Sequence, residues 1–364
     1  AVAEHRRVLE TTATPFLYTV FGAVSNDDYD LCLNRFRAIL LGAFVLSVVG
    51  LARLARHSTT NAFLMVALLT DWFEPLASDL RVGNVGSLQL LQVVVFALLR
   101  LHLAERRRDW ASGLWLGLSL AFKPNLAPLV LFVWLWQLLT RDWTAWFKTV
   151  AGVVGGVGGA VVTSTIAIGS THPWLEWVSA LASIPDANIT TMLGNFSPTE
   201  VLRPYCGPMT GILLSAPGLA LLAYGLAIRL RARQRRAVDS ASSLARCDLI
   251  WVLAIGCLLP IMAVRLAWLH YFVLATPALL LALTRLQHAP LVELAQPSQS
   301  MTSRADRLQR PLLVLAAVGA WLGLAINPLA WIGHSYTMQS YGVMVILATA
   351  ALLVTLCAST GESR

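Results

Sequence analysis

The stretch TVAGVVGGVGGAVVTSTIAI, residues 149–168, runs for twenty residues without one charged side chain. A helix of this length rises about 30 Å, which matches the hydrocarbon thickness of a bilayer. The stretch lacks the period-two alternation of a half-buried strand. In lipid, backbone polar groups must pair within the chain, which a helix achieves and an irregular segment does not. The stretch therefore predicts a transmembrane helix.

Composition extends this interpretation to the whole chain. Hydrophobic residues make up 57% of the 364 residues and charged residues 13%, with a mean hydropathy of +0.67. Soluble domains average about 25% charged residues, so lipid is the expected solvent for most side chains. We expect an all-α polytopic transmembrane bundle of about eleven segments, near residues 38–54, 60–73, 84–102, 110–122, 125–139, 147–168, 209–230, 249–266, 268–285, 311–331 and 341–357.

These segments predict one integral membrane domain over residues 1–364. We divide it into an outer loop and interfacial segment (1–37), N-terminal helices (38–168), an outer loop (169–208) and C-terminal helices (209–357).

The basic residues set the expected orientation. The net charge is +8, and 19 of the 27 Lys and Arg fall on one side if the segments alternate across the membrane. Lys and Arg favour cytoplasmic loops, so that side is the cytoplasm. Residue 1 then lies outside, and we expect a further span upstream of it. We expect a multi-pass protein of a bacterial plasma membrane.

The same residues argue against other classes of protein. The basic side chains lie in loops and form no folded basic face interleaved with aromatic residues, so no nucleic-acid partner is expected. The five cysteines are scattered and include no CxxC pair, which indicates neither a zinc site nor a disulfide framework. We assign no metal ligands, although a metal requirement stays open.

Five glycines, at positions 152, 155, 156, 158 and 159, lie in the opening stretch. Their small-xxx-small spacing within an apolar helix favours close helix packing over a nucleotide-binding loop. In the outer loop that follows, Trp174 anchors the chain at the membrane interface or stacks on a sugar, and both interpretations stay open.

Ionisable residues gather near the outer ends of the expected helices. They are Asp71, Glu74, Asp79, Arg81, Lys123, Arg265 and His270. Charges near membrane depth usually face a cavity or a partner, although long side chains also snorkel to the interface. Lys123, between Phe122 and Pro124 in an apolar hairpin, is the strongest candidate for a functional charge.

Four segments carry a resemblance to a known family. They are Thr14-Pro15-Phe16; Pro75 with Arg81-Val-Gly83-Asn84; Gly113-Leu-Trp-Leu-Gly117 with Phe122-Lys123-Pro124 and Arg141-Asp142-Trp143; and Trp268-Leu-His270-Tyr271 with Pro277. In this order they resemble the GT-C glycosyltransferases, and among these the polyprenol-phosphate-mannose-dependent branch, glycosyltransferase family eighty-seven. Asn84 stands where that family usually has Gln.

The resemblance implies a membrane glycosyltransferase. It would move a sugar, expected to be mannose, from a polyprenyl-phosphate donor to a lipid or glycan acceptor on the outer side, with inversion. Lys123, Arg265 and Arg81 would bind the donor phosphate, and His270 would have a catalytic role beside it. Sugar or acceptor contacts are expected from Asn84, Trp174 and Asn195.

The general base is a further expectation from the resemblance. Such enzymes carry an acidic residue in the first outer loop, which we expect upstream of residue 1. Asp71 and Glu74 are the fallback candidates, and Glu4 and Glu10 match no motif. No cofactor is expected, since the donor lipid is itself a substrate.

Two alternatives from other classes stay open. A lipid or solute transporter would also be helical, with charges more often at the midplane and with internal repeats. A non-catalytic membrane assembly subunit would share the composition. Convergence of the outer polar residues would favour the enzyme.

Overall fold

The computed structural model describes residues 13–23, 25, 28–182, 195–197, 200, 203, 207, 241–263, 267–288, 318–319 and 324. The regular elements within these residues are helices, and one isolated bridge joins Asn195 to Trp268. In chain order they are α2 (Pro15–Gly22), α3 (Tyr29–Leu54), α4 (Thr59–Trp72), α5 (Glu74–Val82), α6 (Gly86–His102), α7 (Glu105–Phe122), η1 (Pro124–Leu126), α8 (Ala127–Leu139), α9 (Trp143–Ile168), α10 (His172–Ala182), α13 (Ala241–Ala263), η4 (Leu269–Ala275) and α14 (Thr276–His288). The predicted all-helical class is confirmed for this part of the chain.

Two of these helices, α3 and α9, are long and apolar enough to cross a membrane, with 26 residues each. A third candidate span results if α5 and α6, which meet at a 115° bend, are counted together. Eleven segments are therefore not confirmed. Apart from three residues, the described part of the chain leaves out the expected segments 209–230, 311–331 and 341–357.

Capping residues place the helix starts outside the apolar runs. Asp28 caps α3 by accepting the backbone N–H three residues on, and Asp142 caps α9 in the same way. Helix α3 therefore begins at Tyr29 and not at residue 38, the expected start of the span. Hydropathy locates the apolar part of a helix, whereas the cap locates its first turn.

Helices α7 and α9 approach each other closely through glycines. A Cβ added at Gly117 would lie 2.2 Å from the backbone oxygen of Val153, and one at Gly156 would lie 2.2 Å from that of Leu114. The expected close packing is confirmed at Gly152 and Gly156. It is wrong for Gly158 and Gly159, where a Cβ would meet no described atom within 4 Å, because only one face of α9 touches α7.

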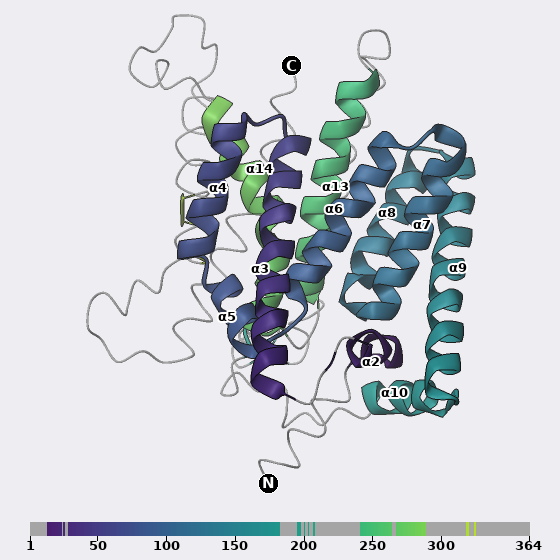
Figure 1. Ribbon diagram of the computed structural model, residues 1–364. Coiled ribbons are helices and arrows are strands. Elements are labelled where there is room, and N and C mark those ends of the chain that lie inside the picture. Colours follow the sequence, from purple (N-terminus) through teal and green to yellow (C-terminus); the bar gives the residue numbers. More distant parts are fainter. Residues whose placement is uncertain are drawn as a thin grey trace, which may run out of the picture.

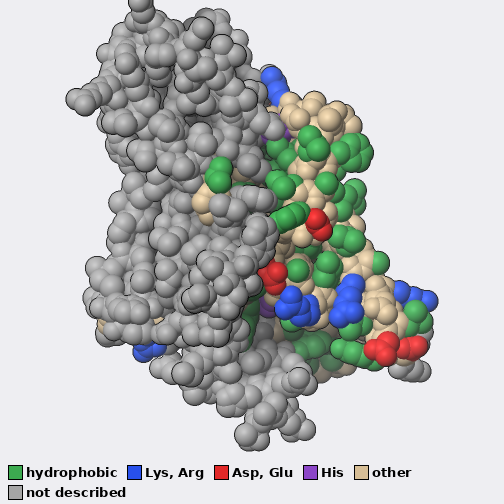
Figure 2. All heavy atoms as spheres, turned by 90° about the vertical axis from the view of Figure 1, so that its left-hand side faces the viewer, with side chains coloured by type: hydrophobic (Ala, Val, Ile, Leu, Met, Phe, Trp, Pro, Cys, Tyr) green, Lys and Arg blue, Asp and Glu red, His purple; other side chains and the backbone are tan. Residues whose placement is uncertain are grey.

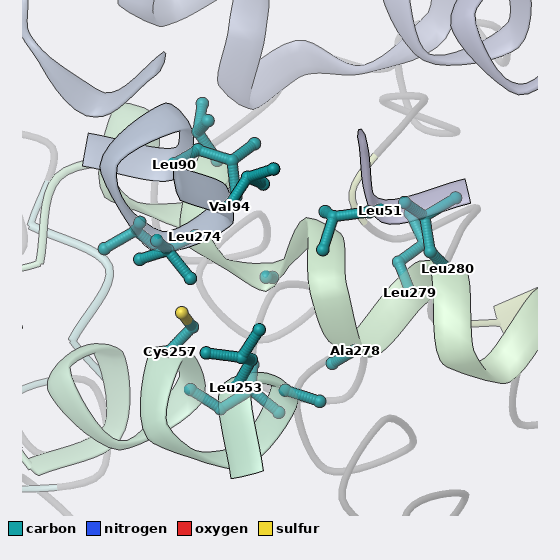
Figure 3. Close-up of a cluster of buried hydrophobic side chains, with 14 of the residues drawn as sticks. Leu51, Leu90, Val94, Leu253, Cys257, Leu274, Ala278, Leu279 and Leu280 are labelled. Atoms are coloured by element: carbon teal, nitrogen blue, oxygen red, sulfur yellow. The ribbon is translucent and has the colours of Figure 1, made fainter. Parts of the chain in front are cut away.

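The main hydrophobic core lies where α3, α6, α13, η4 and α14 meet (Figure 3). Leu51, Leu90, Leu253, Leu274 and Leu279 contribute one buried side chain from each of these elements. Burial of this apolar surface holds η4 against α6. The core therefore fixes the segment that carries His270.

The bundle has two ends that matter for function. Helices α2, α5 and α10 gather at the end where α7 ends and α6 begins, near the bottom of Figure 1. We call it the Lys123 end, and we call the opposite end of α6 and α7 the Arg100 end. On the face drawn in Figure 2, hydrophobic side chains extend over much of the height, and charged side chains gather near the lower end.

Candidate functional site

A left-handed glycine creates the turn that presents Asn84. Helix α5 ends at Val82, and Gly83 has φ 63°, a conformation that costs glycine little. Asn84 follows in the bend between α5 and α6. Its Oδ1 accepts a hydrogen bond from the Val85 N–H at 2.7 Å and one from the Lys123 Nζ at 2.8 Å. The turn thus directs the amide oxygen of Asn84 toward Lys123.

Lys123 is positioned by a helix break. Pro124 disfavours helical backbone at the residue before it, so α7 ends at Phe122 and Lys123 is extended, with φ −156° and ψ 123°. The side chain is only 9% exposed. Its Nζ lies 4.6 Å from the centre of the Tyr271 ring, within the range of a cation–π contact.

Lys123 forms no direct ion pair among the described residues. Its ammonium donates a hydrogen bond to the neutral Asn84, and the buried Asp79 carboxylate interacts with its charge without forming a contact ion pair. An ammonium has three donors, and a buried cation is costly unless it is paired. Lys123 is therefore suited to receive an anion.

His270 lies beside this cation. The side chain is 7% exposed, and its ring packs edge-on against Tyr271 with centroids 4.7 Å apart. Within the described residues, the buried Nε2 has no hydrogen-bond partner. The Tyr271 ring that His270 contacts is the same ring that lies 4.6 Å from the Lys123 Nζ. An imidazole nitrogen without a partner, close to a cation without a direct ion pair, indicates that both serve a ligand.

Asp79 joins α5 to the start of α6. Its fully buried carboxylate accepts hydrogen bonds from the Gly86 N–H at 3.0 Å, and from the Ser87 N–H at 2.8 Å and Oγ at 2.6 Å. A Cβ at Gly86 would lie 2.9 Å from both this carboxylate and the His270 backbone oxygen. The sequence left Asp79 open between a charge at the interface and one that faces a partner, and in the structure its partner is the first turn of α6.

Asn195 holds the segment that leads into η4. Its Oδ1 accepts hydrogen bonds from the Ser197 N–H at 3.0 Å and the Ala267 N–H at 2.8 Å. The Phe196 N–H donates to the Ala267 oxygen at 2.8 Å. The side-chain oxygen expected to contact a sugar is thus bonded to backbone next to Trp268.

The other predicted site residues lie apart from this cluster. Arg81 is exposed and pairs with Glu74 at 3.1 Å, and Asp71 is exposed at the end of α4. Trp174, on α10, donates from Nε1 to the Ser164 Oγ at 2.9 Å. Arg265 lies outside the described residues. The structure therefore brings together Lys123, Asn84 and His270 of the predicted set.

The cluster offers donors to an anion and no described metal site. Across the ranges that the structure describes, no three His, Cys, Asp or Glu side chains gather in a way that could hold a metal ion. The buried charge of Lys123 is in contact with Asn84 and Tyr271, and His270 packs against Tyr271. Fold and site together define a helical membrane protein with a buried cation, a neutral amide and an imidazole at one end of its bundle.

Comparison with known proteins gives the family. The family model for Glycosyltransferase family 87 matches residues 15–255, and the chain belongs to that family. It is therefore a membrane glycosyltransferase, consistent with the GT-C resemblance. The match covers Asn84 and Lys123 and ends before His270. No curated protein and no solved structure was found to match the chain.

Proposed function

We propose that this glycosyltransferase transfers mannose from a polyprenyl-phosphate donor to a lipid or glycan acceptor, on the non-cytoplasmic side and with inversion. The observation that carries the proposal is Lys123, a buried ammonium with a neutral hydrogen-bond partner. A sugar linked through phosphate would supply the directly contacting anion that Lys123 does not have among the described residues.

The apolar surroundings favour a lipid donor. Phe122 and Val85, the neighbours of Lys123 and Asn84 in sequence, pack with Leu17 of α2 in a small hydrophobic cluster. Thr14, which caps α2, donates from Oγ1 to the backbone oxygens of the last two residues of α7. Apolar side chains thus adjoin the cation, which suits a phosphate attached to a prenyl chain better than a water-soluble nucleotide.

The reaction is a single displacement. The acceptor oxygen forms a bond to the anomeric carbon while the bond from that carbon to the phosphate oxygen breaks. The electron pair of the broken bond leaves with the polyprenyl phosphate, whose negative charge increases. A cation fixed beside that phosphate lowers the barrier, and this is the role that we give to Lys123, with His270 in contact with the same phosphate.

The acceptor proton must pass to a carboxylate. Both oxygens of Asp79 already accept hydrogen bonds from α6, which makes it a poor base. Asp71 is exposed, and Glu74 pairs with Arg81. We therefore assign the base to none of these three. Arg265 stays a proposed second phosphate ligand on the strength of its position in sequence.

The proposal includes a topology. Helices α6 and α7 run in opposite directions, so Arg100, near the end of α6, and Lys123, after the end of α7, lie at opposite ends (Figure 1). We propose about eleven segments over residues 1–364 as one membrane domain, with the Arg100 end in the cytoplasm because basic residues gather there.

The test uses purified protein in liposomes with radiolabelled polyprenyl-phosphate mannose and an extract of membrane lipids as acceptor. We expect label on a new lipid or glycan, at a rate that falls at least about 100-fold in Lys123→Ala. Lys148→Ala, which changes the other lysine of the chain, is the matched control.

Each other outcome excludes a specific part of the proposal. If the protein transferred sugar from a nucleotide sugar and not from the polyprenyl phosphate, the proposed lipid donor would be wrong. Movement of labelled donor across the bilayer without a new product would indicate a transporter. Equal transfer rates in Lys123→Ala and Lys148→Ala would show that Lys123 does not bind the donor phosphate.

A further inference from the structure

The contact between Asn84 and Lys123 depends on a sharp bend. Asn84 lies between α5 and α6, which meet at 115°. Its oxygen must stay within hydrogen-bond distance of a lysine that is 39 positions away in sequence. A short, half-buried turn does not hold such an orientation by local preference alone, because ordering it costs conformational entropy.

Asp79, on α5, stabilises the bend by accepting hydrogen bonds from the first turn of α6. One oxygen accepts the Gly86 N–H, and the other accepts both donors of Ser87. These N–H groups belong to the first turn of α6, which has no partners within the helix. The carboxylate also lies at the positive end of the α6 dipole. Three hydrogen bonds to one fully buried carboxylate make this a strong clamp.

Arg37, on α3, stabilises the same bend by donating hydrogen bonds to the last turn of α5. Its Nε donates to the Leu80 backbone oxygen at 2.9 Å, and its Nη2 lies 3.3 Å from the Arg81 backbone oxygen. These are carbonyls of the last turn of α5, where a cation is favourable. Asp79 and Arg37 thus hold the two sides of the bend, and Asn84, within the bend, contacts Lys123.

We propose that Asp79 is a positioning residue: through the first turn of α6 it holds Asn84 against Lys123, and Arg37 supports the same bend from α5. The kinetic part of this inference rests on the proposed donor, and the structural part does not. Asp79 is not the base in this scheme, because both of its oxygens are occupied by α6.

The structural test measures the accessibility of Lys123. The sequence contains two lysines, Lys123 and Lys148, so a limited reaction with an acetylating reagent read by mass spectrometry gives an internal ratio. Lys123 is buried, whereas Lys148, on α9, is half-buried. We expect the ratio of Lys123 to Lys148 labelling to rise several-fold in Asp79→Asn and in Asn84→Ala.

The kinetic test is a double-mutant cycle with the polyprenyl-phosphate donor. Asp79→Asn keeps the shape but loses a charged acceptor, so we expect the donor KM to rise about tenfold or more. Asn84→Ala should have a similar effect. Because both act on one contact, the double variant should lie within about twofold of the more severe single variant. Effects that multiply would overturn the proposal.

Two further variants separate positioning from folding. Ser87→Ala removes one of the three hydrogen bonds and should raise the donor KM about threefold without loss of fold. Asp109→Asn removes a buried carboxylate at the Arg100 end, roughly 20 Å away along α7. It should lower thermal stability and leave both the donor KM and the labelling ratio unchanged. A shift in the ratio equal to that of Asp79→Asn would mean a general loss of packing and would overturn the proposal.

The two proposals fail in different ways. If the labelling ratio rises in Asp79→Asn but the wild type does not use the polyprenyl donor, the donor assignment fails and the positioning role stands. If the ratio is unchanged in Asp79→Asn, the positioning role fails even where transfer is observed.

Discussion

The two ends of the α6–α7 pair each bury a basic side chain, and they treat it differently. At one end the Arg100 side chain, 8% exposed, pairs with Asp109, whose side chain is 4% exposed, and Arg108 reaches the same carboxylate at 3.4 Å. At the other end Lys123 is also buried, and it is bonded to the neutral Asn84. One end of the pair thus holds a charge in a direct ion pair, and the other holds a charge that has none among the described residues.

The difference separates a structural charge from a functional one. A buried cation is tolerated when a carboxylate and hydrogen bonds compensate its lost hydration. Arg100 has that compensation within the chain. Lys123 has an amide oxygen and an aromatic ring, which stabilise a cation more weakly than a carboxylate does and leave two donors for a ligand. The Arg100 end is therefore expected to govern stability, and the Lys123 end activity.

The largest expected effect is the loss of stability when the Arg100–Asp109 ion pair is broken. Asp109→Ala leaves Arg100 buried without its carboxylate, and removal of one partner from a buried pair costs about 3–5 kcal/mol. Thermal unfolding in detergent measures the loss. The fraction that stays folded should retain the donor KM of the wild type. A stability close to that of the wild type would show that the Arg100–Asp109 pair contributes little.

Removal of the charge at the Lys123 end should lower activity without lowering thermal stability. Lys123→Ala should lower kcat/KM at least about 100-fold, with thermal stability unchanged or raised because a costly buried charge is gone. Lys123→Arg, which keeps the charge, should recover part of the rate. Transfer assays and thermal scans on the same preparations check this. A large loss of stability in Lys123→Ala would remove the contrast between the ends.

The glycine contact connects the two ends, since α7 carries Asp109 near its start and ends beside Lys123. Gly156→Ala places a Cβ against the backbone of α7 and should cost about 1–3 kcal/mol by overpacking. Gly158→Ala, on the same helix but facing no described atom within 4 Å, is the matched control and should be neutral or slightly stabilising. Equal melting temperatures for the two variants would contradict this.

The smallest expected effect comes from giving Lys123 a carboxylate partner, as Arg100 already has. Asn84→Asp gives Lys123 a carboxylate, so the protein should be at least as stable as the wild type. The new charge competes with the donor phosphate, and kcat/KM should fall about tenfold. Asn84→Gln keeps a neutral acceptor and serves as the control. Equal activity of Asn84→Asp and Asn84→Gln would show that a neutral partner of Lys123 is not needed for the reaction.

Part of the site was predictable from sequence. The Lys123-Pro124 pair indicates a helix end, because proline restricts the residue before it, and α7 does end at Phe122. The glycines at 152 and 156 indicate close packing, which occurs. The role of Asp79 stayed open at the level of sequence, since nothing within its own helix shows that Gly86 and Ser87 fold back onto it. Asn195 was expected near a sugar, and its oxygen bonds to backbone at Ser197 and Ala267.

The sequence by itself determined the helical class, the membrane environment and the places where helices begin, break and pack closely. These properties depend on residue type and on neighbours within about one helical turn. Only the tertiary structure decided that Lys123 meets Asn84 and not a carboxylate, that the Nε2 of His270 stays without a partner among the described residues, and that Asp79 clamps α6. These contacts join segments that lie far apart along the chain or on either side of a 115° bend, so the packing of the whole bundle sets them.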